Sequence, residues 1–181
     1  MHRVPLIDRA HTTPERQALL DEIHGAFGAT PAMFRAVANS PAALRSMWGA
    51  FKALGGGTLG ARLGEQIAVA VANRNACAYC LAAHTVLGQK AGASAADMAA
   101  AQVGDASDPQ TRAALHFALK VVNERAQVGS ADVQALRDVG FSDEAVVEIL
   151  AHVALNLFTN YINVALEVPV DFPAVALRHA G

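Results

Sequence analysis

Apolar residues recur at intervals of three and four along most of the 181-residue chain. The clearest two series are Leu115, Leu119 and Val122, and Val146, Ile149, Leu150, Val153 and Leu157. This spacing places apolar side chains on one face of an α-helix. No segment shows the apolar-polar alternation of a strand, and alanine, the strongest helix former, dominates the middle of the chain. The pattern predicts an all-α fold.

Helix boundaries are marked by capping residues and glycines. Starts are predicted at Thr13-Pro14, Thr30-Pro31, Ser40-Pro41 and Asp108-Pro109, at Ser94 with Asp97 as its capping-box partner, and at Ser142. Stops are predicted at glycines 55–57, 92, 129 and 140. These signals predict about eight helices in one domain of residues 1–181. The segment Val168–Pro173 is too proline-rich for a helix and is expected to lie extended over the body or a neighbouring subunit.

The composition favours a cytoplasmic oligomer. Hydrophobic residues make up 53% of the chain and charged residues 17%, which leaves little polar surface for a monomer. A net charge of −2 provides no basic surface for nucleic acid. The longest apolar run, Ile67–Ala72, is far shorter than the ~20 residues of a membrane span, and no signal-peptide core follows the first residues. We therefore expect neither nucleic-acid nor membrane partners.

The two cysteines of the chain, Cys77 and Cys80, are only three residues apart. Such a pair cannot link distant segments, and in a reducing compartment it is typical of a catalytic or metal-binding site. In a helix, steps of ~100° place His84 within ~20° of Cys77 and ~40° of Cys80. A histidine one turn away can take the thiol proton or stabilise the thiolate as an imidazolium. The spacing predicts thiol chemistry at Cys77, Cys80 and His84.

Glu65 can join this group only if the helix breaks. Twelve residues of continuous helix would separate it from Cys77 by ~18 Å. Residues 73–75, Asn-Arg-Asn, interrupt the apolar run with two good N-cap residues. If the chain turns back there, Glu65 can reach His84, set its tautomer and stabilise its charged form. The same break would put Cys77 in the first helical turn, where a thiol pKa falls from about 8.5 to roughly 3.5–7.5.

Other interpretations of these residues stay open at the level of sequence. The cysteines could be inert core residues, or ligands of a structural zinc ion, although the other histidines have no metal-site spacing to the pair. Taken alone, Glu65 is more typical of a solvated surface charge, and Tyr79 of a packing residue. We expect neither a metal nor a cofactor.

The order Glu, eleven residues, Cys-x-x-Cys, three residues, His is similar to the signature of the AhpD-like alkyl hydroperoxidases, which are related to the carboxymuconolactone decarboxylases. Glu65, Cys77, Cys80 and His84 match it completely in spacing. The resemblance covers most of the chain. Residues 31–41 resemble the family's entry segment, and residues 151–163 with 170–173 resemble the closing segment of its peroxidase-related branch.

The resemblance implies an alkyl hydroperoxide reductase-like peroxidase with an all-α subunit that assembles into trimers or hexamers. Cys80 would attack a hydroperoxide, Cys77 would resolve the product to a disulfide, and Glu65 with His84 would relay protons. An external thiol or dithiol would supply electrons. One departure is Tyr79, which stands where the founding enzyme has a second relay histidine. The superfamily's decarboxylases lack the cysteine pair, which argues against that reaction.

Two alternatives to a peroxidase remain. The first is a disulfide reductase or redox relay that does not act on peroxide, and the second is an oligomeric redox sensor without turnover.

A second polar series, Glu148, His152, Asn156 and Asn160, recurs every four residues along an otherwise apolar helix. It could be a row of satisfied polar residues between helices or subunits. It could also line the active-site cleft, which would make His152 and Asn156, with Tyr79, auxiliary site residues. Glu148 and His152 are spaced like paired metal ligands, but two ligands are too few for a site.

Overall fold

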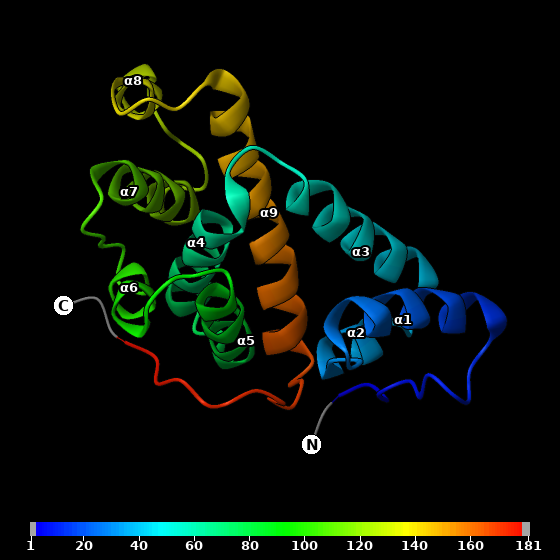
Figure 1. Cartoon of the computed structure of the whole chain (residues 1–181). Helices are drawn as coiled ribbons and strands as arrows, with labels where there is room; N and C mark the ends of the chain where they lie inside the picture. Colours follow the sequence, from blue (N-terminus) through cyan, green and yellow to red (C-terminus); the bar gives the residue numbers. More distant parts are fainter. Residues whose placement is uncertain (1–2, 179–181) are drawn as a thin grey trace.

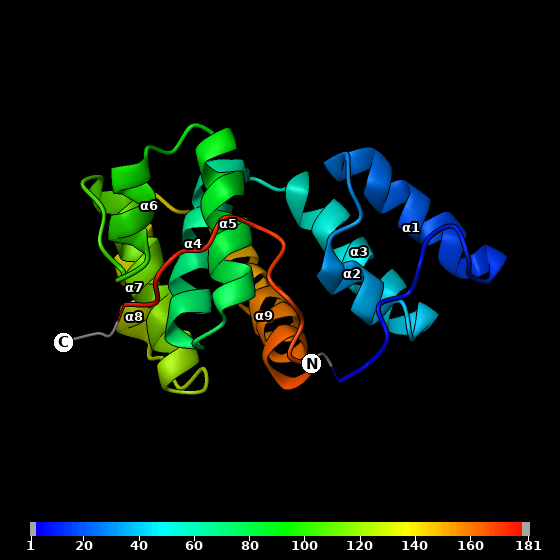
Figure 2. The same ribbon diagram turned by 90° about the horizontal axis from the view of Figure 1, so that it is seen from below.

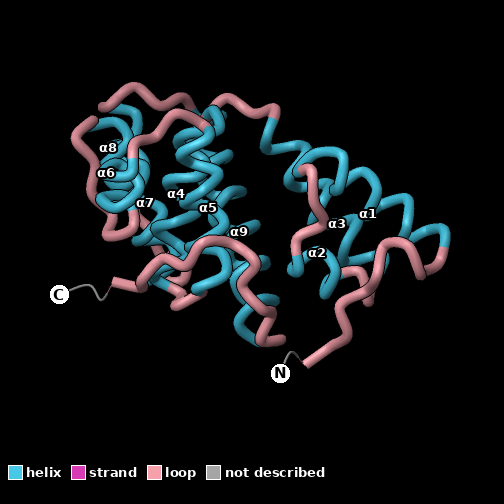
Figure 3. The backbone as a smooth tube through the Cα atoms, turned by 60° about the horizontal axis from the view of Figure 1, so that its bottom comes forward, coloured by secondary structure: helices cyan, strands magenta, loops and turns pink. Residues whose placement is uncertain are grey.

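The computed structural model describes residues 3–178, and this part of the chain consists of α-helices and loops without a strand (Figure 3). The helices are α1 (Pro14–Phe27), α2 (Ala32–Val37), α3 (Pro41–Gly55), α4 (Gly60–Arg74), α5 (Ala78–Lys90), α6 (Ala95–Ala101), α7 (Pro109–Asn123), α8 (Ser130–Asp138) and α9 (Asp143–Ala165). The all-α prediction is confirmed, with nine helices in the described residues rather than about eight. The extent of a single domain over residues 1–181 stays a prediction.

Most of the predicted helix starts are confirmed. Four predicted N-cap side chains accept the backbone N–H three residues later, namely those of Ser40, Ser94, Asp108 and Ser142. Thr13 is the N-cap of α1, although its side chain makes no such bond.

Two boundary predictions are wrong. Pro31, not Thr30, is the N-cap of α2, and the Thr30 hydroxyl instead lies 3.2 Å from His24 Nδ1. Gly129, predicted as a stop, is the N-cap of α8, because its N–H donates to Asp132 Oδ2 at 2.7 Å and starts a new helix there. This start accounts for the additional helix.

The long helix α9 runs through the centre of the molecule, between α1–α3 on one side and α4–α8 on the other (Figure 1). It packs against α2, α3, α4, α5, α7 and α8. The most extensive contact between two helices is that of α4 with α5, which lie side by side. The site described below forms where α4, α5 and α9 meet.

By length and composition alone, α9 also satisfies the criteria for a membrane-crossing helix, with a mean hydropathy of 1.4 over its most apolar window, of which 44% is buried. A core helix meets the same criteria. Because six helices pack against α9, it is a core helix of this fold.

After α9 the chain runs extended over α5 and α4 towards α6 (Figure 2). Asp171 Oδ2 accepts a hydrogen bond from the backbone N–H of Ala32 at 2.7 Å. Further along, the backbone N–H of Arg178 donates to Asn73 Oδ1 at 2.8 Å. The prediction that this segment lies extended over the body is confirmed.

Candidate active site

The chain reverses direction between α4 and α5 within three residues. Asn75 ends α4 as its C-cap, Ala76 takes a positive φ of 53°, and Cys77 is the N-cap of α5. This turn is the predicted break, and it lays the two helices side by side. As a result, Glu65 Oε2 accepts a hydrogen bond from His84 Nδ1 at 2.7 Å. The predicted approach of Glu65 to His84 is confirmed.

The Glu65–His84 pair is largely withdrawn from solvent, with side-chain exposures of 23% and 9%. Burial disfavours the charged imidazolium, but the charge and hydrogen bond of Glu65 and the charge of Cys80 outweigh it. The pKa of His84 is therefore raised above its ordinary value. Glu65 thus holds the His84 proton on Nδ1 and favours its cationic form.

Cys80 lies buried in the first turns of α5, surrounded by hydrogen-bonding groups. Asn163 Nδ2 donates to its Sγ at 3.1 Å, and Thr159 Oγ1 lies 3.7 Å from the same sulfur. The hydrogen bond from Cys77, the charge of His84 and these two partners outweigh burial and lower the pKa of Cys80 to about 6. Cys80 is therefore largely a thiolate at neutral pH.

Cys77 behaves differently from the sequence-based expectation. It precedes the first turn of α5 as the N-cap, where its Sγ accepts the backbone N–H of Cys80 at 3.4 Å. Its pKa is nevertheless raised, because its thiol donates to the Cys80 thiolate and because it is buried beside that charge. The helix-end argument for an acidic Cys77 is wrong, since these effects exceed the backbone contribution.

Asn163 and Thr159 are site residues that the sequence interpretation misses. Both belong to α9, and Asn163 is 83 residues from Cys80 in the chain. The sequence does contain an indication of one of them, Asn163. Asn163 lies three residues after Asn160, so it continues the polar series of α9 by one helical step.

Two cavities flank His84. One, of about 30 Å³, borders Cys80 and His84 and is otherwise apolar, with walls that include Phe27, Phe34, Phe51, Tyr79 and Phe172. We call it the aromatic pocket. The other, of about 130 Å³, borders His84 together with Glu65, His152 and Asn156. His84 therefore lies between an apolar space at the thiolate and a more polar space behind it.

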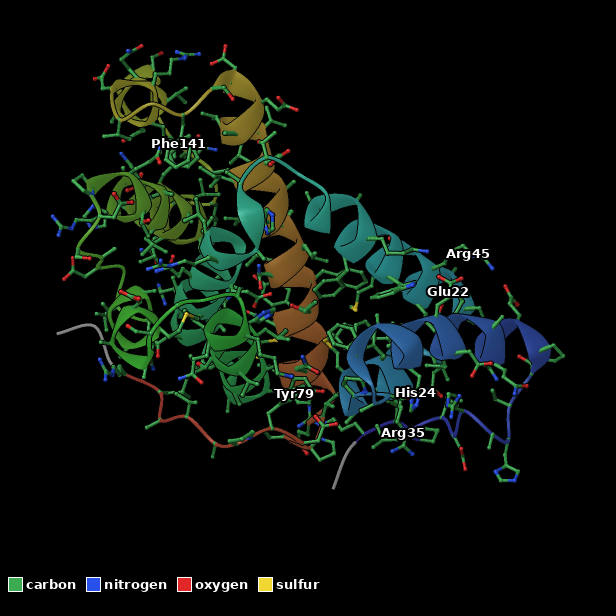
Figure 4. The ribbon with its side chains drawn as sticks, viewed as in Figure 1. Glu22, His24, Arg35, Arg45, Tyr79 and Phe141 are labelled. Carbon is green, nitrogen blue, oxygen red and sulfur yellow. The ribbon has the colours of Figure 1, made fainter. Side chains whose placement is uncertain are left out.

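Tyr79 lies beside the C-terminal segment and α2 (Figure 4). Its hydroxyl accepts the backbone N–H of Met33 at 3.2 Å, and its ring meets the edge of Phe172 at a centroid distance of 5.7 Å. Burial raises the pKa of Tyr79. These contacts support the packing interpretation, although the ring also forms part of the aromatic pocket wall.

The residues of the polar series on α9 have different structural roles. Glu148 stabilises the turn before α4, since it accepts the backbone N–H groups of Thr58 and Leu59. His152 packs on Gly64, where a Cβ would come within 2.9 Å of its Cε1, and burial lowers its pKa. Asn156 Nδ2 donates to the His152 carbonyl at 2.8 Å.

Asn160 completes the series, because its Oδ1 accepts from Asn75 at the turn before Cys77. The series therefore both supports the fold and lines the cavity behind His84. Within residues 3–178, no three His, Cys, Asp or Glu side chains are grouped so that they could hold a metal ion.

Comparison with known proteins agrees with this arrangement. The profile of the carboxymuconolactone decarboxylase family matches residues 39–124. The crystal structure of an uncharacterized peroxidase-related protein with an alkylhydroperoxidase AhpD core, from Ralstonia eutropha JMP134, is 28% identical and superposes with a TM-score of 0.84, covering 94% of this chain and 92% of its own. The chain thus has an AhpD-like fold, and its residues 39–124 are similar to the carboxymuconolactone decarboxylase family.

Other structures share the AhpD-like fold at lower identity. A peroxidase-related protein from Silicibacter sp. TM1040 is 24% identical, with a TM-score of 0.80 and coverage of 96% and 90%. The debrominase Bmp8, in complex with 2,3,4-tribromopyrrole, is 21% identical, with a TM-score of 0.78 and coverage of 93% and 91%. At these identities the likeness extends to the fold alone. No curated protein matches the chain by sequence.

Proposed function

We propose that this AhpD-like protein is a thiol-dependent peroxidase that reduces hydroperoxides through Cys80 and Cys77. The observation that supports this most directly is the arrangement of Glu65, His84 and Cys80. Glu65 accepts a hydrogen bond from His84, and the charge of His84 helps to lower the pKa of the buried Cys80 to about 6, which makes it a thiolate. A thiolate, rather than a thiol, is the nucleophile that attacks peroxide oxygen.

In the proposed reaction, the Cys80 thiolate attacks the terminal oxygen of a hydroperoxide and the O–O bond breaks. The departing alkoxide takes a proton from His84, which leaves an alcohol and a Cys80 sulfenic acid. Glu65 stabilises the charged His84 that donates this proton. The Cys77 thiol then attacks the Cys80 sulfur, so that a disulfide forms and water leaves.

The position of Cys77 suits the second step. Its thiol already contacts the Cys80 sulfur, and both residues are free cysteines in the reduced protein. Because Cys77 is the N-cap and Cys80 is only three residues later, the disulfide can form within the first turn of α5. Its raised pKa keeps Cys77 protonated until Cys80 has been oxidised.

The aromatic pocket favours a peroxide over a bulky disulfide as the oxidant. A volume of about 30 Å³ beside Cys80 corresponds to a molecule of roughly water size. A hydroperoxide group fits that space at the sulfur. A disulfide substrate that reacts at Cys80 would need more room than this pocket has.

Turnover with a panel of hydroperoxides and thiol donors tests the proposal, with reduction of a disulfide dye as a parallel assay. We expect Cys80→Ser to abolish peroxide consumption and Cys77→Ser to permit one slow turnover that ends at a sulfenic acid. Stoichiometric oxidation without turnover, for every donor, would instead indicate a redox sensor. Labelling of Cys77 by a sulfenate reagent in Cys80→Ser would exchange the roles of the two cysteines.

Reductive dehalogenation is a second candidate. The wall of the aromatic pocket includes the rings of Phe27, Phe34 and Phe51 next to Cys80, and a planar halogenated ring could stack on such a wall if these rings move apart to widen the pocket beyond about 30 Å³. A debrominase shares the fold. Release of bromide from a bromopyrrole that depends on Cys80, at a rate exceeding peroxide turnover, would favour this candidate.

We also propose that the protein is a cytoplasmic homo-oligomer, a trimer or a hexamer. Exposed apolar side chains such as Val147 and Leu150 on α9 support assembly, because their burial between subunits would remove them from water. Sedimentation of the purified protein tests the oligomeric state.

A further inference from the structure

The Cys80 sulfur is reached through the aromatic pocket. Cys80 is only 1% exposed, and it borders this pocket. The cavity behind His84 and a further cavity of about 220 Å³ beside Cys77 do not include Cys80 in their walls. The aromatic pocket is therefore the space through which an oxidant contacts Cys80.

A second cavity adjoins the aromatic pocket and has a volume of about 130 Å³. We call it the outer cavity. Four residues line both the outer cavity and the aromatic pocket, namely Phe27, Pro31, Leu87 and Phe172. Residues that border two cavities lie between them, so these four side chains form the partition that separates the two spaces.

The outer cavity is the solvent side of this partition. Ala29, Lys90 and Asp171 belong to its wall and are exposed, whereas Cys80 and His84 on the inner side are buried. The partition itself is apolar. The apolar part of an oxidant can therefore leave water in the outer cavity before the oxidant reaches the thiolate.

Aromatic contacts hold two of the partition side chains. The Phe27 ring packs on Phe34 with a centroid distance of 5.7 Å, and the Phe172 ring meets Tyr79 at the same distance. Displacement of either ring would break a favourable ring–ring contact. These two rings therefore form the fixed sides of the partition.

Leu87 is the partition residue that can move most freely. It lies on α5 three residues after His84, which places it on the same face of the helix one turn further along. Its side chain is half-buried and can change between staggered rotamers, whereas the ring of Pro31 is closed on its own backbone. A rotamer change of Leu87 would connect the outer cavity to the aromatic pocket.

We propose that the oxidant enters by the outer cavity and that Leu87, between the fixed rings of the partition, limits the width of the molecule that reaches Cys80. The reactive end occupies the aromatic pocket, and the apolar body stays in the outer cavity. A hydroperoxide on a primary carbon is narrow enough to pass, whereas one on a tertiary carbon is too wide beside its O–O group. This substrate preference rests on the proposed function, but the width limit at Leu87 does not.

Alkylation of Cys80 tests the width limit without peroxide. The reduced full-length protein is treated with narrow iodoacetamide or broad N-phenylmaleimide, and the label on Cys80 is quantified by mass spectrometry. Leu87→Ala should raise the ratio of the broad to the narrow labelling rate by about tenfold, since small changes in an apolar pocket alter discrimination by at least that factor. Leu119→Ala, the same change at a half-buried position outside both cavities, should leave the ratio unchanged. An unchanged ratio in Leu87→Ala would overturn the proposal.

Filling the outer cavity tests the route of entry. Ala29→Trp introduces a large ring at an exposed position in the wall of this cavity and should slow the labelling of Cys80 by both reagents. Ala96→Trp, at an exposed position on α6 outside both cavities, is the matched control and should not change the rate. Labelling of Cys80 at the original rate in Ala29→Trp would show that reagents enter elsewhere and would contradict the route.

Hydroperoxides of different shape test the substrate preference. The unmodified protein should consume n-butyl hydroperoxide faster than tert-butyl hydroperoxide, and Leu87→Ala should reduce this difference. Faster consumption of tert-butyl hydroperoxide by the unmodified protein would overturn the proposed preference. A protein that consumes neither hydroperoxide, but whose alkylation ratio rises in Leu87→Ala, would support the width limit and contradict the peroxidase.

Discussion

His84 Nδ1 donates to Glu65 Oε2 at 2.7 Å across the α4–α5 pair, although the two residues are 19 positions apart. The contact depends on the turn at residues 75–77, which lays α5 back along α4. It keeps one ring nitrogen of His84 engaged, so that only the other can serve the substrate.

The pH dependence of thiol reactivity follows from the Cys80 pKa. Because that pKa is lowered to about 6, the reactive thiolate forms as the pH rises through about 6 and is lost below it. In the protein with both cysteines intact, the rate of Cys80 alkylation by iodoacetamide should rise with pH, with a midpoint near pH 6. A midpoint near the ordinary cysteine value would contradict the described environment of Cys80.

Asn163→Ala should move this midpoint upward. The substitution removes a hydrogen bond to a charged sulfur, and such bonds contribute about 1.5–3 kcal/mol, which corresponds to roughly 1–2 pKa units. Alkylation measured against pH reports the change. Asn39→Ala serves as the control, because the Asn39 amide donates to the carbonyls of Pro5 and Ala36 and not to a cysteine. An unchanged midpoint in Asn163→Ala would show that its amide does not stabilise the thiolate.

Glu65→Gln should reduce peroxide turnover by ~10²–10⁴-fold, the usual effect of losing an acid–base group. Without the carboxylate charge, burial favours neutral His84, so its pKa should fall and less imidazolium remains to protonate the leaving group. Titration of the His84 ring protons by NMR checks the direction. Glu144→Gln, at an exposed position in the first turn of α9, should leave turnover unchanged.

Tyr79→Phe should lower stability more than activity. The change leaves the Met33 N–H without its acceptor in a buried position, which costs about 1–3 kcal/mol in the free energy of unfolding. Urea denaturation measures this, and hydroperoxide turnover is measured in parallel. A large loss of turnover with unchanged stability would instead place the phenol in the reaction.

Glu148→Ala should destabilise the protein by about 1–3 kcal/mol, the range for leaving backbone donors without their hydrogen-bond acceptor. Its carboxylate accepts the backbone N–H groups of Thr58 and Leu59 in the turn that leads into α4. Thermal unfolding checks the result, again with a Glu144 variant as the control. An unchanged melting temperature would show that water satisfies these two N–H groups equally well.

The sequence by itself determined the helical class and the core of the candidate site. Glu65, Cys77, Cys80 and His84 lie within a span of twenty residues. Their approach depends on local geometry, because helical periodicity aligns Cys80 with His84 and the polar residues 73–75 indicate the turn. Each of these signals acts over a few residues, which is why they can be interpreted without a tertiary structure.

Only the tertiary structure decided which sulfur is acidic. Helix-end effects pointed to Cys77, but Asn163 and Thr159 reach Cys80 from α9, and burial acts on both thiols. The acidity of a buried thiol is set by its desolvation and by the charges and donors around it. Those groups come from chain segments about 80 residues away, brought together by packing, and no local pattern around the cysteines encodes them.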